Sequence, residues 1–342
     1  MSTNFEYNRM RITYSILLLF FFLSPIIAQT GGEGYTFLRF PFSARANALG
    51  GHTVSLVERD PSLVFHNPAL LGAEMDGMIN LNYMNHMADI NVGSALFTKG
   101  VNDRSAWGVG ISFISYGNFK ETSADNTVLG SFTAKDIQVS GFYSRDLSER
   151  WRIGIALKAL YSSLEQYTSF GIASDVGLSY YNSEKKFSAG ITLKNAGAQL
   201  KAYEDTRQKL PWDVQLGISQ GAKHAPFRFS LTAMYLTQWS FDSVNNIADA
   251  DKKDDFLKTL AKHLVFGVDY VPSENFWLGV GFTPKRYYDM KLSGGNLLSG
   301  FSAGAGVRIR MFEVGVSVAK YHPSALSLML SVSTTLSDLK KQ

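Results

Sequence analysis

The sequence of 342 residues contains no cysteine, which excludes disulfide bridges, thiolate metal sites, a cysteine nucleophile and a lipid-modified N-terminal cysteine. Charged residues are also scarce, because they form 18% of the chain, below the roughly 25% of an average globular domain. The 33 basic and 29 acidic residues are spread along the whole chain. Since nucleic-acid binding requires a concentrated basic patch, we predict no nucleic-acid partner.

Long hydrophobic runs are missing too. The longest apolar stretch, Ile16–Ile27, is shorter than the roughly 20 residues that a membrane-spanning helix needs. It follows Arg9 and Arg11 and precedes the small residue Ala28, an order that is typical of a cleaved signal peptide. We therefore predict a signal peptide over residues 1–28 and a mature chain that leaves the cytoplasm.

Recognisable catalytic and metal-binding motifs are absent as well. The six histidines lack a metal-binding spacing such as H-E-x-x-H. In the acidic stretch at 249–255, Lys253 stands where a calcium-binding EF-hand loop needs an oxygen ligand. We predict that the protein is not an enzyme and that it binds no cofactor or metal.

A period-two alternation of apolar with small or polar residues runs from Gly77 to the end of the chain. Side chains on a strand point alternately to opposite faces, so each such segment has one apolar and one polar face. The pattern predicts fourteen strands near residues 77–84, 89–98, 106–116, 134–145, 150–162, 170–181, 186–196, 211–220, 227–238, 263–271, 275–283, 299–309, 311–320 and 325–337. Their close spacing leaves no room for the crossover connections of parallel strands.

The connections between these segments alternate in length. Short ones separate most pairs, whereas longer ones are expected near 117–133, 197–210, 239–262 and 284–298. Aromatic residues gather at the segment ends, as in the two girdles of an outer-membrane barrel. We predict an all-β, fourteen-stranded antiparallel transmembrane β-barrel over residues 77–342, in the outer membrane, with both termini in the periplasm. A soluble β-sandwich is the alternative, but it has no reason to alternate its loop lengths.

Residues 29–76 do not follow the strand pattern. Asp60-Pro61 and Asn67-Pro68 each place a capping residue before a proline, which is how a short helix begins. A fourteen-stranded barrel leaves a lumen to be filled, so we predict that 29–76 is a lumenal plug. The alternative, a disordered periplasmic leader, would leave many apolar residues unburied. Charges of both signs on the predicted lumen faces indicate a network that holds the plug, with a selective pore as the competing interpretation: Arg152, Lys158, Asp175, Lys194, Arg228, Asp269, Arg308 and Glu313.

Three motifs of the plug segment carry a resemblance to a known family: the small-residue stretch Ser43–Gly51, the Asp60–Ser62 turn and Phe65–Leu71. The last contains the plug motif Asn67, Pro68 and Ala69. Together with the barrel pattern, they resemble the N-terminal signature of FadL-type barrels, and most of all the PorQ-like and PorV-like barrels of the type IX secretion system. One departure is the C-terminus, which ends Leu339-Lys340-Lys341-Gln342 rather than in an aromatic residue.

The resemblance implies a barrel component of an attachment complex at the cell surface. Its direct partner would be a PorZ-like surface protein, within a complex that also contains PorU and PorV, and membrane lipid and lipopolysaccharide would surround the barrel. The alternative function is that of a FadL-like transporter of hydrophobic small molecules. As the candidate partner-contact loop we select 249–262, because Phe256, Leu257 and Leu260 fall on one face of an amphipathic stretch. That stretch can instead simply fold over the barrel mouth.

Overall fold

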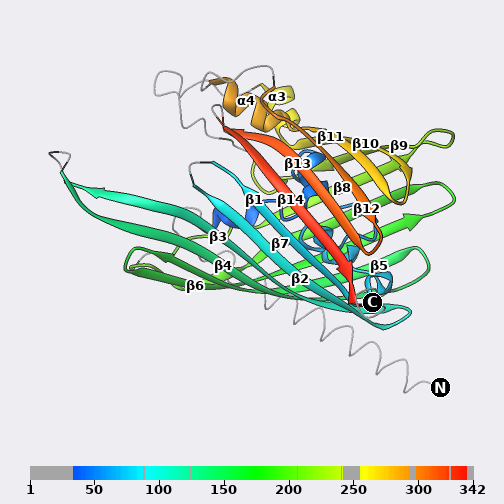
Figure 1. Ribbon diagram of the computed structural model, residues 1–342, viewed down its shortest axis with the longest axis horizontal. Helices are drawn as coiled ribbons and strands as arrows, with labels where there is room; N and C mark the ends of the chain where they lie inside the picture. The colour runs from blue at the N-terminus through cyan, green and yellow to red at the C-terminus, as the bar shows by residue number, and fades with distance from the viewer. Residues whose placement is uncertain are drawn as a thin grey trace.

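Fourteen antiparallel strands close into a single barrel in the described part of the chain (Figure 1). The computed structural model describes residues 34–87, 89–123, 125, 127–205, 207–239, 241, 255–292, 298–322 and 325–336. Each strand pairs with its neighbours along the chain, and β1 pairs with β14 to close the sheet. The predicted all-β, fourteen-stranded fold class is confirmed.

The strands agree closely with the period-two segments of the sequence. They are β1 (Met78–Asn85), β2 (Asn91–Asn102), β3 (Ser105–Thr122), β4 (Val128–Asp146), β5 (Trp151–Leu164), β6 (Tyr167–Asn182), β7 (Phe187–Lys201), β8 (Asp213–Gly221), β9 (Phe227–Ala233), β10 (Leu264–Ser273), β11 (Phe276–Phe282), β12 (Phe301–Ile309), β13 (Phe312–His322) and β14 (Ala325–Thr335). Two helices lie in the longer connections: α3 (Phe256–Lys262) and α4 (Pro284–Leu292).

The predicted long connection over 117–133 is wrong. β3 continues to Thr122 and β4 begins at Val128, so most of this segment is strand. The alternation ends near Ser115 because a bulge interrupts the pairing there, with Gly117 at a φ of 77°. Beyond the bulge, the hairpin has neither lipid on one face nor a packed lumen on the other. The alternation of apolar and polar residues that identifies a strand in the sequence is therefore lost.

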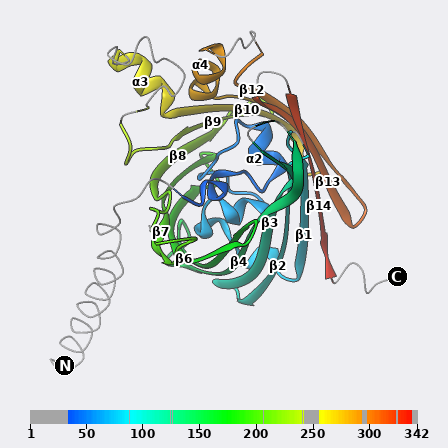
Figure 2. The same cartoon turned by 90° about the vertical axis from the view of Figure 1, so that its left-hand side faces the viewer.

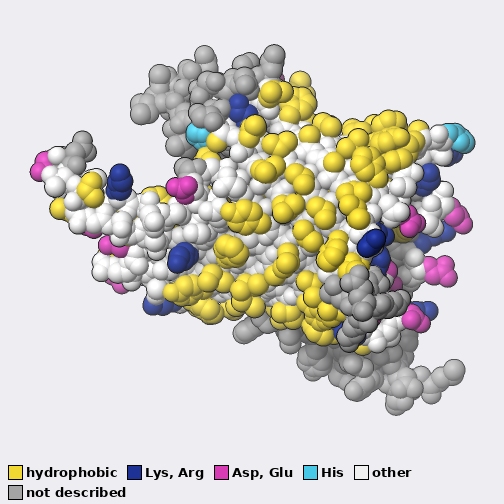
Figure 3. Space-filling view, in the orientation of Figure 1, with side chains coloured by type: hydrophobic (Ala, Val, Ile, Leu, Met, Phe, Trp, Pro, Cys, Tyr) yellow, Lys and Arg dark blue, Asp and Glu magenta, His cyan; other side chains and the backbone are white. Residues whose placement is uncertain are grey.

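The outer face of the barrel carries an apolar belt (Figure 3). Side chains with 40% or more of their surface exposed include Ile111, Val139, Ile155 and Leu328. Aromatic residues stand at the ends of the belt, among them Trp107, Tyr143, Trp151 and Tyr181. So much exposed apolar surface is unfavourable in water and is accommodated by lipid. Among the described residues, no helix combines the length and apolar character needed to cross a membrane.

Residues 34–76 form short helices inside the barrel (Figure 2). They are η2 (Thr36–Arg39), α2 (Ala44–Ala48), η3 (Pro61–Phe65), η4 (Pro68–Leu70) and η5 (Ala73–Met75). Gly34 donates its backbone N–H to Lys209 O (2.9 Å) in the connection between β7 and β8, at the end of the longer connections. Met78 pairs with Thr335 at the opposite end, beside the short turns. The predicted signal peptide at 1–28 and both chain termini lie outside the described residues, so the signal peptide stays a prediction.

Candidate functional site

The plug motif Asn67-Pro68-Ala69 begins the short helix η4 deep in the lumen. Asn67 is fully buried. Its side-chain Oδ1 accepts the Ala69 N–H (3.0 Å), while its Nδ2 donates to Val54 O (2.8 Å). The Asp60 carboxylate caps η3 in the same way, by accepting the Ser62 N–H (2.9 Å). The two predicted helix starts are confirmed, and Asn67 in addition joins two turns of the plug.

Glycines on three adjacent strands form a seat for this motif. A Cβ atom built on Gly177 of β6 would overlap Asn67 Oδ1, and one built on Gly154 of β5 would overlap the Pro68 carbonyl. On β7, a Cβ at Gly190 would overlap Val54 O. Gly154 and Gly177 are direct cross-strand partners. The wall therefore approaches the plug backbone so closely that no side chain fits between them.

The small-residue stretch of the plug has a second glycine seat. Ser43 caps its helix α2, because the Ser43 Oγ accepts the Ala46 N–H (3.2 Å). Gly50 and Gly51 follow the C-terminal end of the helix and have φ values of 102° and 96°, which disfavour any residue with a side chain. A Cβ atom at Gly281 of β11 would overlap the Gly50 backbone. Small residues occupy Ser43–Gly51 because the helix lies directly against the strands.

The first charge cluster of the lumen joins the plug to β9 and β10. Asp269 accepts hydrogen bonds from Arg45 of the plug (2.9 Å) and from Arg228 (2.6 Å). Glu58 of the plug pairs with Arg228 and lies 3.8 Å from Arg45. Burial opposes ionisation of Glu58, but the Arg45 and Arg228 guanidinium groups outweigh it and lower the pKa of this carboxyl. The cluster holds two plug residues by their charge.

A second cluster lies on β5, β6 and β7. Lys158 donates to Asp175 at 2.6 Å, and Lys194 stands 4.0 Å from the same carboxylate. Lys194 also donates to Phe65 O of the plug (2.7 Å). Nearer the short turns, Arg152 pairs with Asp146 and Glu74, and Arg308 pairs with Glu313. All eight charges predicted on the lumen face are paired. Arg152, Lys194, Arg228 and Asp269 contact plug residues as predicted, whereas Arg308 and Glu313 pair with each other across neighbouring strands.

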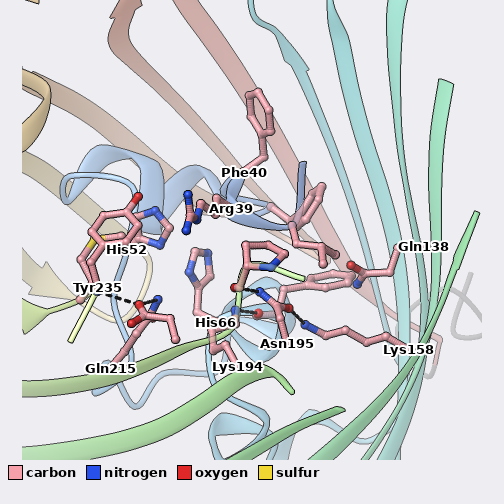
Figure 4. A pocket seen from close by; sticks show the side chains of 16 residues that line it. Arg39, Phe40, His52, His66, Gln138, Lys158, Lys194, Asn195, Gln215 and Tyr235 are labelled. Carbon is pink, nitrogen blue, oxygen red and sulfur yellow. Dashed lines mark hydrogen bonds between the residues drawn. The ribbon is translucent and has the colours of Figure 1, made fainter. Parts of the chain in front are cut away.

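A small polar cavity separates the plug from β8 (Figure 4). Its volume is about 20 Å³, enough for one water molecule. His66 Nε2, Asp213 Oδ1 and Gln215 Oε1 line it, and each is buried without a hydrogen-bond partner. Burial and the nearby Lys194 hold the pKa of His66 well below its usual range, so this ring is neutral. The cavity is not a passage for a larger solute.

An apolar cluster, which we call the apolar seam, fills part of the remaining lumen. Beside it lie a smaller apolar cluster of plug residues and a buried, hydrogen-bonded polar group: Asn80, Asn82, Ser94, Ser331 and Ser333. The wall residues of the apolar seam come from β14 and β1 to β6, and its plug residues include Phe37, Phe42 and Phe65. Met75 and Met78 lie at its short-turn end, whereas the partly buried side chains of Ile90 and Tyr116 pack against it toward the longer connections. The wall residues are Met78, Met84, Val92, Leu96, Ala106, Ile114, Phe142, Ala156, Leu160, Ala173 and Met329. The buried pair Lys158–Asp175 stands among these wall residues on β5 and β6, so apolar and charged groups share this part of the lumen.

The candidate partner-contact residues lie on α3, far from the plug motif. Phe256 and Leu257 are 66% and 70% exposed, and Leu260 is 38% exposed. Figure 2 shows α3 and α4 beside the ring of strands rather than across its opening. The Lys258 ammonium lies over the Tyr288 ring of α4 (5.4 Å). Positions 249–254 of the predicted loop lie outside the described residues, and partner contact by this loop stays a prediction.

Comparisons with known proteins show the fold. No protein-family model and no curated protein matches the sequence. Among solved structures, a mutant of the TodX monoaromatic hydrocarbon channel has a TM-score of 0.57 at 10% identity, covering 86% of this chain and 99% of that one. The CymD monoaromatic hydrocarbon channel has a TM-score of 0.55 at 13% identity, covering 86% and 97%. A Pseudomonas aeruginosa FadL homologue has a TM-score of 0.51 at 11% identity, covering 86% of this chain and 98% of that one. The fold is that of the FadL-type outer-membrane barrels.

This likeness bears out the FadL-type part of the resemblance that the sequence carries. The narrower likeness to PorQ-like proteins has no counterpart among these structures, so it remains a proposal. Among the described residues, no group of three or more histidine, cysteine or acidic side chains could hold a metal ion. The glycine seat was not predicted from the sequence. Its only signal there is the placing of Gly154, Gly177 and Gly190 within period-two strands.

Proposed function

We propose that this chain is an outer-membrane barrel that lets hydrophobic small molecules cross when its plug shifts. The observation that carries the proposal is the apolar seam, which runs through the lumen from Ile90 and Tyr116 to Met75 and Met78. Contact with such a lining lowers the free energy of a hydrophobic solute, whereas it raises that of an ion. In the proposed orientation, the short turns and the C-terminus face the periplasm. Gly34 lies at the other end, so its position gives no support to a periplasmic N-terminus.

On this proposal, the plug closes the route. Phe37, Phe42 and Phe65 fill the seam, while Asp269 holds the plug through Arg45 and Lys194 holds it through the Phe65 carbonyl. A passage would open if the aromatic side chains moved while the charged anchors stayed in place. The similar barrels support this proposal, since two of them are described as monoaromatic hydrocarbon channels. That support comes from the fold, because the identities are 10% and 13%.

Uptake of a labelled monoaromatic hydrocarbon such as toluene tests the proposal. Cells that lack the protein should accumulate the compound several-fold more slowly than cells that express it, at equal outer-membrane integrity. In cells that lack the parent protein, the Phe65→Asp variant, which places a charge in the seam, should insert into the outer membrane but should not restore uptake. Equal uptake in all three strains would contradict a transport function.

A second function, in an attachment complex of the type IX secretion system, is favoured by the exposed apolar residues of α3. Phe256, Leu257 and Leu260 face solvent beyond the strands, and such a surface commonly binds a partner. On this proposal the barrel anchors a PorZ-like surface protein, in a complex with PorU and PorV. The sequence resemblance supports it, and the comparisons with solved structures support transport more strongly.

Replacing 249–262 by a short Gly/Ser linker distinguishes the two functions. If α3 contacts the surface partner, recovery of a PorZ-like protein with the solubilised barrel should fall at least about tenfold, which corresponds to about 1.4 kcal/mol of binding free energy. The barrel should remain heat-modifiable and hydrocarbon uptake should persist. Undiminished recovery would exclude this loop as the contact.

A further inference from the structure

The hairpin of β3 and β4 extends past every neighbouring strand (Figure 1). The ladder between β2 and β3 ends at the pair Asn91–Ser115, and the ladder between β4 and β5 ends at Ala134–Leu164. Beyond those points, from Asn118–Thr133 to Thr122–Val128, the two strands pair only with each other. We call residues 116–133 the projecting hairpin.

The projecting hairpin lies beyond the apolar belt. Along β3 the outward-facing residues Ile111 and Phe113 are apolar and exposed, and the next outward residue is Ser115. Along β4 the outward residues change from Val139 to Lys135. Since the lipid-facing positions become polar here, the hairpin projects into water rather than into the membrane.

One edge of this hairpin has unused backbone groups. Thr133 O accepts a hydrogen bond from Glu165 N (3.1 Å), so the Thr133 backbone points away from β3. Thr133 is the cross-strand partner of Asn118, so these two residues form a pair that is not hydrogen-bonded, and Asn118 also directs its N–H and C=O groups away from β4. Such pairs alternate with hydrogen-bonded pairs along an antiparallel ladder, so the N–H and C=O groups of Lys120 point outward as well. Within the described part of the chain, Asn118–Thr122 pair with no strand except β4. The connection between β1 and β2 comes close only at Gly117, where a Cβ atom would lie 3.1 Å from Asp89 Cβ.

Apolar side chains accompany this open edge. The Phe119 and Phe132 rings stack across the hairpin, 5.2 Å apart and 19° from parallel. Phe119 remains 41% exposed, and Val128 and Leu129 near the turn are 57% and 64% exposed. A two-stranded hairpin is marginally stable in water on its own, and an exposed strand edge is a template for pairing with another chain.

We propose that the edge Asn118–Thr122 of β3 binds an extended segment of a partner protein, which adds to the projecting hairpin as a third strand. Strand addition supplies partners for the free N–H and C=O groups of Asn118 and Lys120. Alternate side chains of the incoming strand pack on the Phe119–Phe132 face, and an acidic residue on its other face pairs with Lys120. The proposal goes beyond transport and does not depend on it, because the hairpin lies outside the lumen.

Photo-cross-linking from position 118 in intact cells tests the proposal. The full-length protein carries a benzophenone amino acid in place of Asn118, in three backgrounds: the parent, Lys120→Pro and Lys120→Thr. The Lys120→Pro variant removes an edge donor without touching the β3–β4 ladder, whereas the Lys120→Thr variant keeps the backbone donor. We expect one discrete protein adduct, mapped to an extended segment of the partner, that falls about tenfold in Lys120→Pro and less than twofold in Lys120→Thr.

Three results would overturn the proposal: no protein adduct in the parent, an adduct with lipid or with a second copy of this chain, or equal yields in Lys120→Pro and Lys120→Thr. If Lys120→Pro fails to insert, a shortened variant that joins Asn118 to Thr133 through an Asn-Gly turn replaces it. This variant removes the Phe119–Phe132 face and leaves both ladders of the barrel intact. It should then lose the partner adduct that the parent gives from position 135, while it still inserts as a heat-modifiable barrel.

Discussion

Replacing Gly177 with leucine should displace the plug and turn a closed barrel into a conducting one. Even a Cβ atom at this position overlaps the buried Asn67 Oδ1 atom. The plug cannot shift toward β5 to make room, because Gly154 on that strand is already in contact with the Pro68 backbone. Overpacking of this kind typically costs about 1–3 kcal/mol, and a whole leucine side chain exceeds the space available. The plug must move, since the strands are fixed by their ladders.

Planar-bilayer recording measures this effect directly. The parent should be nearly silent, and Gly177→Leu should show frequent open events and admit large antibiotics into cells. Gly141→Leu is the matched control, because a Cβ atom there meets nothing within 4 Å and the position faces outward from β4. If the Gly177 and Gly141 variants conduct equally, the glycine seat does not hold the plug closed.

The barrel could be predicted because its constraint repeats. Each strand must present an apolar residue to lipid at every second position, so the sequence of β13 alternates visibly between Phe312 and Val318. The same reasoning fails for the projecting hairpin, since Phe119 and Phe132 have water on both sides of their strands. The period-two pattern therefore reports contact with lipid rather than strand structure itself.

The plug could be predicted only in outline. Local chemistry is visible in one sequence, so the prolines after Asp60 and Asn67 indicated two helix starts that the structure contains. The contacts that seat the plug join residues far apart in the chain, such as Asn67 with Gly177. Likewise, the lumen charges were recognisable by their sign and position, but the sharing of Asp269 by Arg45 and Arg228 depends on how the plug enters the barrel.

Asp269 should contribute more to the stability of the plugged barrel than any half-exposed ion pair. Its side chain is 2% exposed and accepts from both Arg45 and Arg228. Asp269→Asn keeps the shape but leaves the buried Arg45 and the partly buried Arg228 with only Glu58 as an ion-pair partner. Breaking a buried pair in this way costs about 3–5 kcal/mol. The loss should appear as a lower midpoint of unfolding in urea for the protein in lipid vesicles.

Two further variants separate buried charge from general damage. Asp146→Asn makes the same chemical change in the pair with Arg152, whose side chains are 25% and 19% exposed. It should cost less than Asp269→Asn, because this pair is more exposed and Arg152 keeps Glu74 as a partner. Arg45→Met in the Asp269→Asn background removes one unpaired buried charge and keeps the side-chain packing on Trp277, against which Arg45 lies at 4.9 Å. It should recover part of the lost stability, because the destabilisation comes from uncompensated charge. Equal losses in the Asp269 and Asp146 variants, or no recovery in the double variant, would show that the cluster does not anchor the plug.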